Sequence, residues 1–211
     1  MGVQERRARE KQELRQEILS AARELFIREG FENLSIRKVA EKIEYSPTTI
    51  YLYFQDKADL LDCVCEETLE KLESRLAALR VTIQDPVERL KSGLRAYIEF
   101  GLEYPNDYRV AFMMEVKQEL GGSDRCPRCH EQGQKTFDHL RGNITECIQT
   151  NAFGVHDVEA TSQTLWAAAH GLTSLLILHP SFPWLDRDTL IDHLLCTFVD
   201  GLKCPALESV R

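Results

Sequence analysis

Several features that would place a protein in a familiar class are missing from this sequence of 211 residues. No apolar run is long enough to cross a bilayer, and the longest candidate, Leu172–Leu178, is only a short stretch. The first residues, MGVQERRAREKQELRQ, contain no apolar segment of the kind that a secretory signal requires. We therefore expect a cytoplasmic protein with no membrane partner.

Sequence motifs for catalysis are also missing. The chain has no Gly-rich phosphate-binding loop, no Gly-x-Ser-x-Gly elbow and no His-Glu-x-x-His zinc motif. We therefore expect neither enzymatic activity nor a cofactor. An enzyme built on a helical bundle and a helical adaptor for another protein remain alternatives, and a DNA affinity that falls steeply with salt would argue against both.

The net charge of −8 at pH 7 by itself disfavours a nucleic-acid partner. The acidic excess, however, lies mostly in residues 63–211, whereas residues 1–62 carry nearly equal numbers of basic and acidic side chains. A DNA-binding module needs only a local basic face, so the charge distribution leaves such a partner open.

Apolar residues recur with helical spacing from end to end, and strand-like alternation is nearly absent. This pattern predicts an all-α fold of about nine helices. Glycine and proline mark the breaks between them, beginning with Gly30 after the first helix. The expected helices span residues 13–29, 36–43, 47–54, 57–80, 87–103, 107–120, 130–152, 157–178 and 187–202.

The third expected helix has a strong start signal, because Ser46 can cap it and Pro47 stands at its first position. A short helix that follows two others after a tight turn is typical of a helix-turn-helix module. In such a module a small apolar core holds the third helix against the major groove of DNA. We expect Tyr45 to fill the turn before this helix.

The run LSAARELFIREGFENLSIRKVAEKIEYSPTTIYLYFQDKADLL resembles the DNA-binding domain of the TetR family over residues 13–62. Two positions depart from the family pattern: Glu44 stands where the turn usually has glycine, and Tyr53 where the family often has histidine. The shared features are Phe26-x-x-x-Gly30-Phe31, Ser35, Val39-Ala40, Ser46, the aromatic run Tyr51-Leu52-Tyr53-Phe54 and Lys57.

Carried over by position, the resemblance implies DNA contacts from three helices. Ser35 and Lys57 would hold phosphates, and Thr48 would meet base edges or a thymine methyl group. The implied DNA-binding set is Ser35, Arg37, Pro47, Thr48, Thr49, Tyr51, Tyr53 and Lys57. Tyr51 could instead pack against the first helix, and Arg37 could be merely solvated.

The resemblance also implies three parts of the chain: an arm at residues 1–12, the helix-turn-helix domain at 13–62, and a ligand-binding and dimerisation domain at 63–211. The basic residues of the arm, Arg6, Arg7, Arg9 and Lys11, could touch the DNA backbone or minor groove. Because their charges alternate with acidic ones, a solvated extension of the first helix is an equal alternative.

In the third part, Trp166, His170 and Gly171 resemble the Trp-His-Gly signature of one TetR C-terminal subclass. The resemblance implies effector contacts from Tyr108, Phe112, Met113, Met114, Trp166 and His170. It implies a dimer interface on the last two helices, with contacts from Leu165, Ala169, Leu172, Leu194 and Phe198. The alternative for each of these residues is an ordinary place in the core.

As a whole, the resemblance implies a homodimer that binds a palindromic operator in double-stranded DNA. Two recognition helices spaced about 34 Å apart would read two half-sites one helical turn apart. A small-molecule effector that favours a different spacing would release such a repressor from its operator.

The segment Cys126-Pro127-Arg128-Cys129-His130 needs its own interpretation. Cys-x-x-Cys-His is the attachment motif of c-type haem, but that chemistry occurs outside the cytoplasm. Cys126 and Cys129 could be half of a zinc site, completed by His130, His139 or Cys147, or part of a thiol redox sensor. A metal- or redox-responsive regulator of the same fold is therefore the alternative, although we favour an ordinary polar loop. The odd number of seven cysteines argues against paired structural disulfides.

Overall fold

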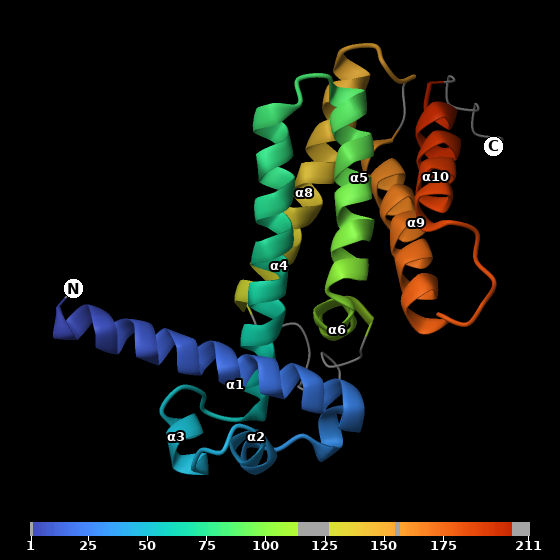
Figure 1. The fold of residues 1–211 in the computed structure, drawn as a ribbon. Helices are drawn as coiled ribbons and strands as arrows, with labels where there is room; N and C mark the ends of the chain where they lie inside the picture. Colours follow the sequence, from blue (N-terminus) through green and yellow to red (C-terminus); the bar gives the residue numbers. More distant parts are fainter. Residues whose placement is uncertain (1, 114–126, 155–156, 204–211) are drawn as a thin grey trace. The chain divides into compact units, whose positions relative to one another are not determined.

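The computed structural model describes residues 2–113, 127–154 and 157–203, and most of them lie in helices (Figure 1). No strand occurs among these residues, so the expected all-α fold is confirmed. The elements are α1 (Val3–Asn33), α2 (Ile36–Lys42), α3 (Pro47–Tyr51), α4 (Lys57–Thr82), α5 (Pro86–Glu103), α6 (Pro105–Tyr108), the π-helix η1 (Arg109–Met113), α8 (Pro127–Gln149), α9 (Val158–Leu178) and α10 (Arg187–Gly201).

Helix α1 is longer at its N-terminus than the apolar pattern predicted. Residues 3–12 continue the helix, and ion pairs between residues four apart, Arg6 with Glu10 and Arg9 with Glu13, stabilise this polar part. At the other end Gly30 breaks the helix with φ 77° and ψ 172°, a conformation that essentially only glycine adopts. The helical alternative for the first residues is therefore the one observed, and their contact with DNA remains a prediction.

The chain forms two compact units. The first comprises Met1–Leu69 and Asn106–His130, and the second comprises Glu70–Pro105 and Glu131–Arg211. Helix α4 thus begins in the first unit and ends in the second. The compact units do not test the functional boundaries expected after residues 12 and 62, which remain predictions.

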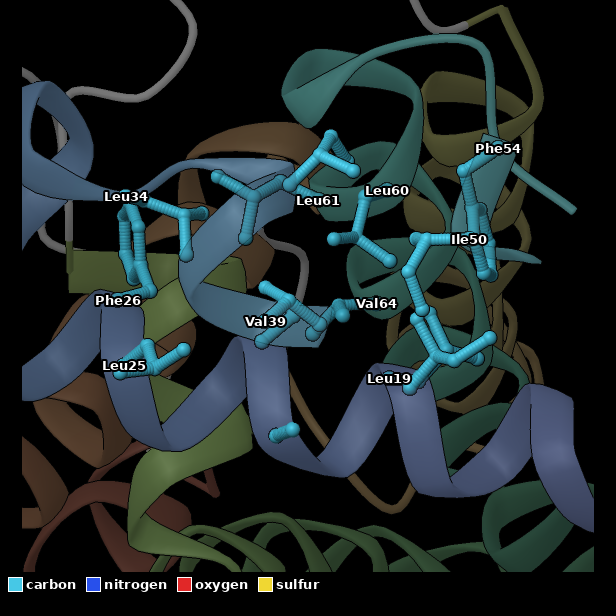
Figure 2. Packing of buried hydrophobic residues seen from close by; sticks show 14 of the residues in the cluster. Leu19, Leu25, Phe26, Leu34, Val39, Ile50, Phe54, Leu60, Leu61 and Val64 are labelled. Atoms are coloured by element: carbon cyan, nitrogen blue, oxygen red, sulfur yellow. The ribbon is translucent and has the colours of Figure 1, made fainter. Parts of the chain in front are cut away.

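The core of the first unit lies between α1, α2, α3 and the start of α4. Figure 2 shows Val39 and Ile50 among the leucines of α4, with Phe26 of α1 nearby. Each of these side chains is fully removed from solvent, and burial of one such side chain contributes roughly 1.5–3 kcal/mol to folding. The labelled members of the core are Leu19, Leu25, Phe26, Leu34, Val39, Ile50, Phe54, Leu60, Leu61 and Val64.

A nearly buried ion-pair cluster also holds the first unit together. Arg23 of α1 lies 3.1 Å from a carboxylate oxygen of Glu67 in α4 and 2.5 Å from one of Asp107 in α6. Arg15, two helical turns earlier on α1, pairs with the same Glu67. Two arginines thus balance two carboxylates where the surroundings exclude most water, which is the condition for burying charge.

In the second unit α5 packs against both α9 and α10. The facing residues of α9, Leu165, Ala169, Thr173 and Ile177, recur every four residues and are buried. This spacing places them in one stripe along the helix. Helix α10 repeats the arrangement with Ile191, Leu195 and Val199.

Polar groups inside the helices are satisfied in two ways. The hydroxyl groups of Ser162 and Thr173 in α9 donate to carbonyl oxygens of their own helix, at 2.6 and 2.8 Å. Arg89 of α5 instead joins separate elements, since it donates to Asn143 Oδ1 of α8 at 2.7 Å and pairs with Glu146. Buried hydrogen-bonding groups without partners are costly, so each arrangement supports the fold.

The expected helix over residues 107–120 is the least accurate prediction. Helix α6 begins earlier, at Pro105, and ends at Tyr108, where the π-helix η1 continues to Met113. Residues 114–120 lie outside the described part of the chain. Among the described residues, no helix combines the length and apolar character needed to span a bilayer.

Candidate nucleic-acid interface

Helix α3 begins as its sequence predicts. The Ser46 hydroxyl oxygen accepts a hydrogen bond from the backbone N–H of Thr49 at 3.2 Å, and Pro47 occupies the first turn. The Thr49 hydroxyl lies 2.9 Å from the Ser46 hydroxyl, so the two share a second hydrogen bond. These caps fix the start of a helix too short to be stable alone.

One side of α3 is anchored and the other faces solvent. Ile50 and Phe54 insert into the core of the first unit, whereas Pro47 and Thr48 are exposed and 57% of Tyr51 is exposed. The alternative that Tyr51 packs against α1 is therefore not observed. An exposed threonine and an exposed tyrosine on a helix of this width could contact base edges and phosphates in a major groove.

The turn between α2 and α3 differs from our expectation at one residue. Tyr45 does not fill the turn, because 45% of it is exposed. The turn is instead made by Glu44, which has φ 59° in the left-handed region. Glycine is the usual residue there because it has no Cβ to clash, which explains why the family pattern has glycine at this position.

Helix α2 presents a helix N-terminus beside α3. The Ser35 oxygen accepts a hydrogen bond from the Lys38 N–H at 3.2 Å, and its own hydroxyl hydrogen remains able to donate to an anion. Arg37 is exposed at the first turn. Lys38 is held by Glu29 at 2.7 Å, and this contact and the Arg28 side chain lower the pKa of the Glu29 carboxyl.

Two further predicted residues lie after α3. Tyr53 is half-buried, and the Lys11 ammonium of α1 lies 5.9 Å from the centre of its ring. Lys57 is half-buried at the start of α4, whose first turn is capped by the Asp56 carboxylate through the N–H groups of Ala58 and Asp59. The first unit therefore carries all eight predicted DNA-binding residues, and their contacts with DNA remain predictions.

In the second unit, Trp166 and His170 share a polar cluster that the sequence did not reveal. The Trp166 indole N–H donates to the Tyr97 hydroxyl of α5 at 3.1 Å, and this hydroxyl lies 3.3 Å from His170 Nδ1. Ser174 Oγ lies 3.3 Å from the other ring nitrogen. Burial lowers the pKa of His170, so its neutral form is favoured.

The other predicted effector contacts belong to the first unit. Tyr108 is completely buried, and its ring packs against Phe112 with the centres 4.8 Å apart. Phe112 and Met113 are half-buried in η1, and Met114 lies outside the described residues. The effector role of all four residues remains a prediction.

The predicted dimerisation residues fall into two groups. Leu165 and Ala169 are buried within a single subunit, in the stripe that faces α5. Burial leaves these two side chains little surface for a second subunit, and their role in dimerisation remains a prediction. Leu172 and Leu194 are half-buried, and Phe198 is exposed.

The predicted metal or redox loop is only partly described. Cys126 lies outside the described residues, Cys129 is buried, and His130 is exposed. Cys129 is disulfide-bonded, which contradicts our expectation for the cysteines. Within the described ranges, no group of His, Cys, Asp and Glu residues is arranged to hold a metal ion.

Comparison with known proteins identifies two matching families. A model described as bacterial regulatory proteins, tetR family, matches residues 18–64. A second, described as tetracyclin repressor-like, C-terminal domain, matches residues 90–198, more than half of the chain. The second range includes Trp166, His170 and Gly171.

Individual proteins are similar over different lengths. The HTH-type transcriptional regulator HbdR from Aromatoleum sp. (strain CIB) is 34% identical over 86 residues, which are 41% of this chain and 38% of that protein. The chain spans about half the length, or less, of the curated relatives it matches.

Two solved structures share the fold. A bacterial regulatory protein of the tetR family from Rhodococcus RHA1 has a TM-score of 0.77 at 17% identity, covering 90% of this chain and 97% of that one. The transcriptional regulator FadR from Bacillus subtilis in complex with stearoyl-CoA has a TM-score of 0.72 at 20% identity, covering 88% and 98%.

Proposed function

Because the chain belongs to the TetR family of bacterial regulatory proteins, we propose that it is a DNA-binding transcriptional regulator. The observation that carries this proposal is the presentation of α3. Ile50 fixes the helix to the core, while Thr48 and Tyr51 point away from it into solvent. A helix held in this way can enter a major groove without unfolding any part of the first unit.

Selection of bound duplexes from a random pool tests this proposal. We expect a palindromic consensus whose half-sites are about one helical turn apart or a multiple of that. Thr48→Ala and Tyr51→Ala should each weaken binding of the selected duplex by about 5- to 150-fold, the range for the loss of one base contact worth about 1–3 kcal/mol. Thr82→Ala, an exposed threonine of the second unit, is the matched control. Recovery of no consensus, or equal affinity of all variants, would reject the proposal.

We propose that the regulator is a homodimer that uses α9 and α10. Helix α9 exposes Leu175 and Leu178, and α10 exposes Phe198 beside the half-buried Leu194. Apolar side chains exposed on two neighbouring helices favour association with a second apolar surface. A two-fold pair would also supply the two recognition helices that a palindrome needs.

Leu175→Asp tests this interface, because it places a charge in the apolar surface. Sedimentation velocity should show a dimer for the unmodified protein and a shift toward monomer for this variant. Val81→Asp, at an exposed position of α4, is the control with the same charge change. A dimer that persists in Leu175→Asp would locate the interface elsewhere.

We propose that a small-molecule effector releases the protein from its operator, so that it acts as a repressor. In the second unit the effector would meet the cluster of Tyr97, Trp166 and His170, which combines aromatic surface with hydrogen-bonding groups. Because the structurally similar protein from Bacillus subtilis was solved with stearoyl-CoA, that compound is the first probe. It should displace the selected duplex from the unmodified protein and do so less well from Trp166→Ala.

A further inference from the structure

The polar N-terminal part of α1 carries two cations without acidic partners. Arg6 and Arg9 are paired with Glu10 and Glu13, at 3.4 and 3.6 Å. No ion pair to Arg7 or Lys11 is formed by any described residue, and both side chains are exposed. Positive charge that is not neutralised within the chain is available to an external anion.

Helix geometry places Arg7 and Lys11 on the side of α1 that, further along the helix, packs on the core of the first unit. Arg7 and Lys11 are four residues apart, and Ile18 and Ala22 follow at helical spacing on the same stripe. Ile18 and Ala22 are fully buried against the core of the first unit. The side of α1 that packs on the core of the first unit therefore carries Arg7 and Lys11 in the turns that precede this core. Arg6 and Arg9 lie on the opposite side of the helix.

A direct contact agrees with this placement. The Lys11 ammonium lies 5.9 Å from the centre of the Tyr53 ring, and the next residue of the stripe, Arg15, lies 5.6 Å from that of Phe54. Tyr53 and Phe54 follow Leu52, the residue that caps the end of α3. In Figure 1 the N-terminal turns of α1 extend past α3.

We propose that Arg7 and Lys11 bind phosphates of the DNA strand that flanks the base pairs contacted by α3. This inference rests on the proposed DNA-binding function and adds a second contact region to each subunit. Guanidinium and ammonium groups bind phosphate oxygens through charge-assisted hydrogen bonds, and such contacts do not depend on base sequence. The N-terminal helix would therefore lengthen the footprint and raise the affinity for any duplex.

The salt dependence of binding tests this inference. The probe is a duplex of about 40 base pairs of mixed sequence, long enough for two half-sites. The double variant Arg7→Gln/Lys11→Gln removes two proposed phosphate contacts from each subunit. Each lost contact should reduce the slope of log K against log salt by about 0.9, so the change should be about 2 per subunit.

Arg6→Gln/Arg9→Gln is the matched control, because it removes the same charge from the same turns on the opposite side. We expect less than half the change in slope for this control, and circular dichroism of both variants checks that the N-terminal turns of α1 remain helical. Equal changes in both variants would show a general effect of net charge, and an unchanged slope in Arg7→Gln/Lys11→Gln would show no contact; either result overturns the inference. An unmodified protein that binds without salt dependence would instead reject the proposed function itself.

Discussion

Arg89 offers the sharpest test of how the second unit is held together. Its guanidinium donates to Asn143 Oδ1 at 2.7 Å and to the carbonyl oxygens of Ile83 and Gln84 at 2.9 and 3.3 Å, and it pairs with Glu146. Only 4% of Arg89 is exposed. Arg89→Met keeps most of the apolar stem but removes every one of these interactions.

The expected loss follows from which partners water can reach afterwards. Breaking a buried ion pair by removing one partner destabilises a protein by about 3–5 kcal/mol. The Glu146 side chain is 37% exposed and can be hydrated, but Asn143 stays buried with an unpaired amide oxygen. We therefore expect the lower end, about 3 kcal/mol, or a fall in melting temperature of roughly 6–12 °C for a chain of this length.

Thermal and urea unfolding followed by circular dichroism measure this loss. Arg95→Met is the control, since Arg95 lies on the same helix but pairs with the largely exposed Asp188 and Asp192. Surface pairs contribute about 0–1 kcal/mol, so its loss should be below about 1 kcal/mol. A loss for Arg89→Met no greater than that for Arg95→Met would refute the reasoning.

Three further predictions concern backbone conformation and pH. Glu44→Gly should stabilise the first unit by about 0.5–1 kcal/mol because it relieves the left-handed conformation, whereas Glu41→Gly inside α2 should destabilise it by about 1 kcal/mol; equal signs in urea unfolding would contradict this. Gly30→Ala should lower the free energy of unfolding by about 1–3 kcal/mol, and an unchanged urea midpoint would be the contrary result. Because burial lowers the pKa of His170, unfolding takes up a proton as the pH falls through the ordinary histidine value of about 6.5, so stability should decrease from about pH 7 to about pH 5. His170→Gln should show a smaller decrease, and a stability that rises on acidification would oppose the assignment.

Short-range signals made much of the fold predictable. Ser46 with Pro47 marked the start of α3, Asp56 marked that of α4, and Gly30 marked the break in α1. Each of these signals acts within one helical turn, so the sequence nearby contains all the information needed. The ends of α5, α9 and α10 were predicted to within two residues for the same reason.

Features that depend on distant residues were not predictable in this way. Trp166 donates a hydrogen bond to the hydroxyl of Tyr97, which lies 69 residues away in the sequence. No local sequence pattern predicts such a contact. Leu165 and Ala169 were assigned to a dimer interface on the family resemblance, because the spacing of apolar residues in α9 cannot say which side of the helix is buried within the subunit. Residues 3–12 lack apolar periodicity, so the sequence could not decide between a separate arm and the helical extension that is observed.

The two back-bonded hydroxyl groups of α9 have a mechanical consequence. Because Ser162 and Thr173 donate to carbonyl oxygens of their own helix, neither one fixes the register between α9 and α5. The Tyr97 hydroxyl, by contrast, contacts both Trp166 and His170 across that pair of helices. A molecule that competes for the Tyr97 hydroxyl would remove a polar restraint on the sliding of α9 along α5. The apolar side chains of Leu165, Ala169 and Ile177 would keep their van der Waals contacts during such a movement.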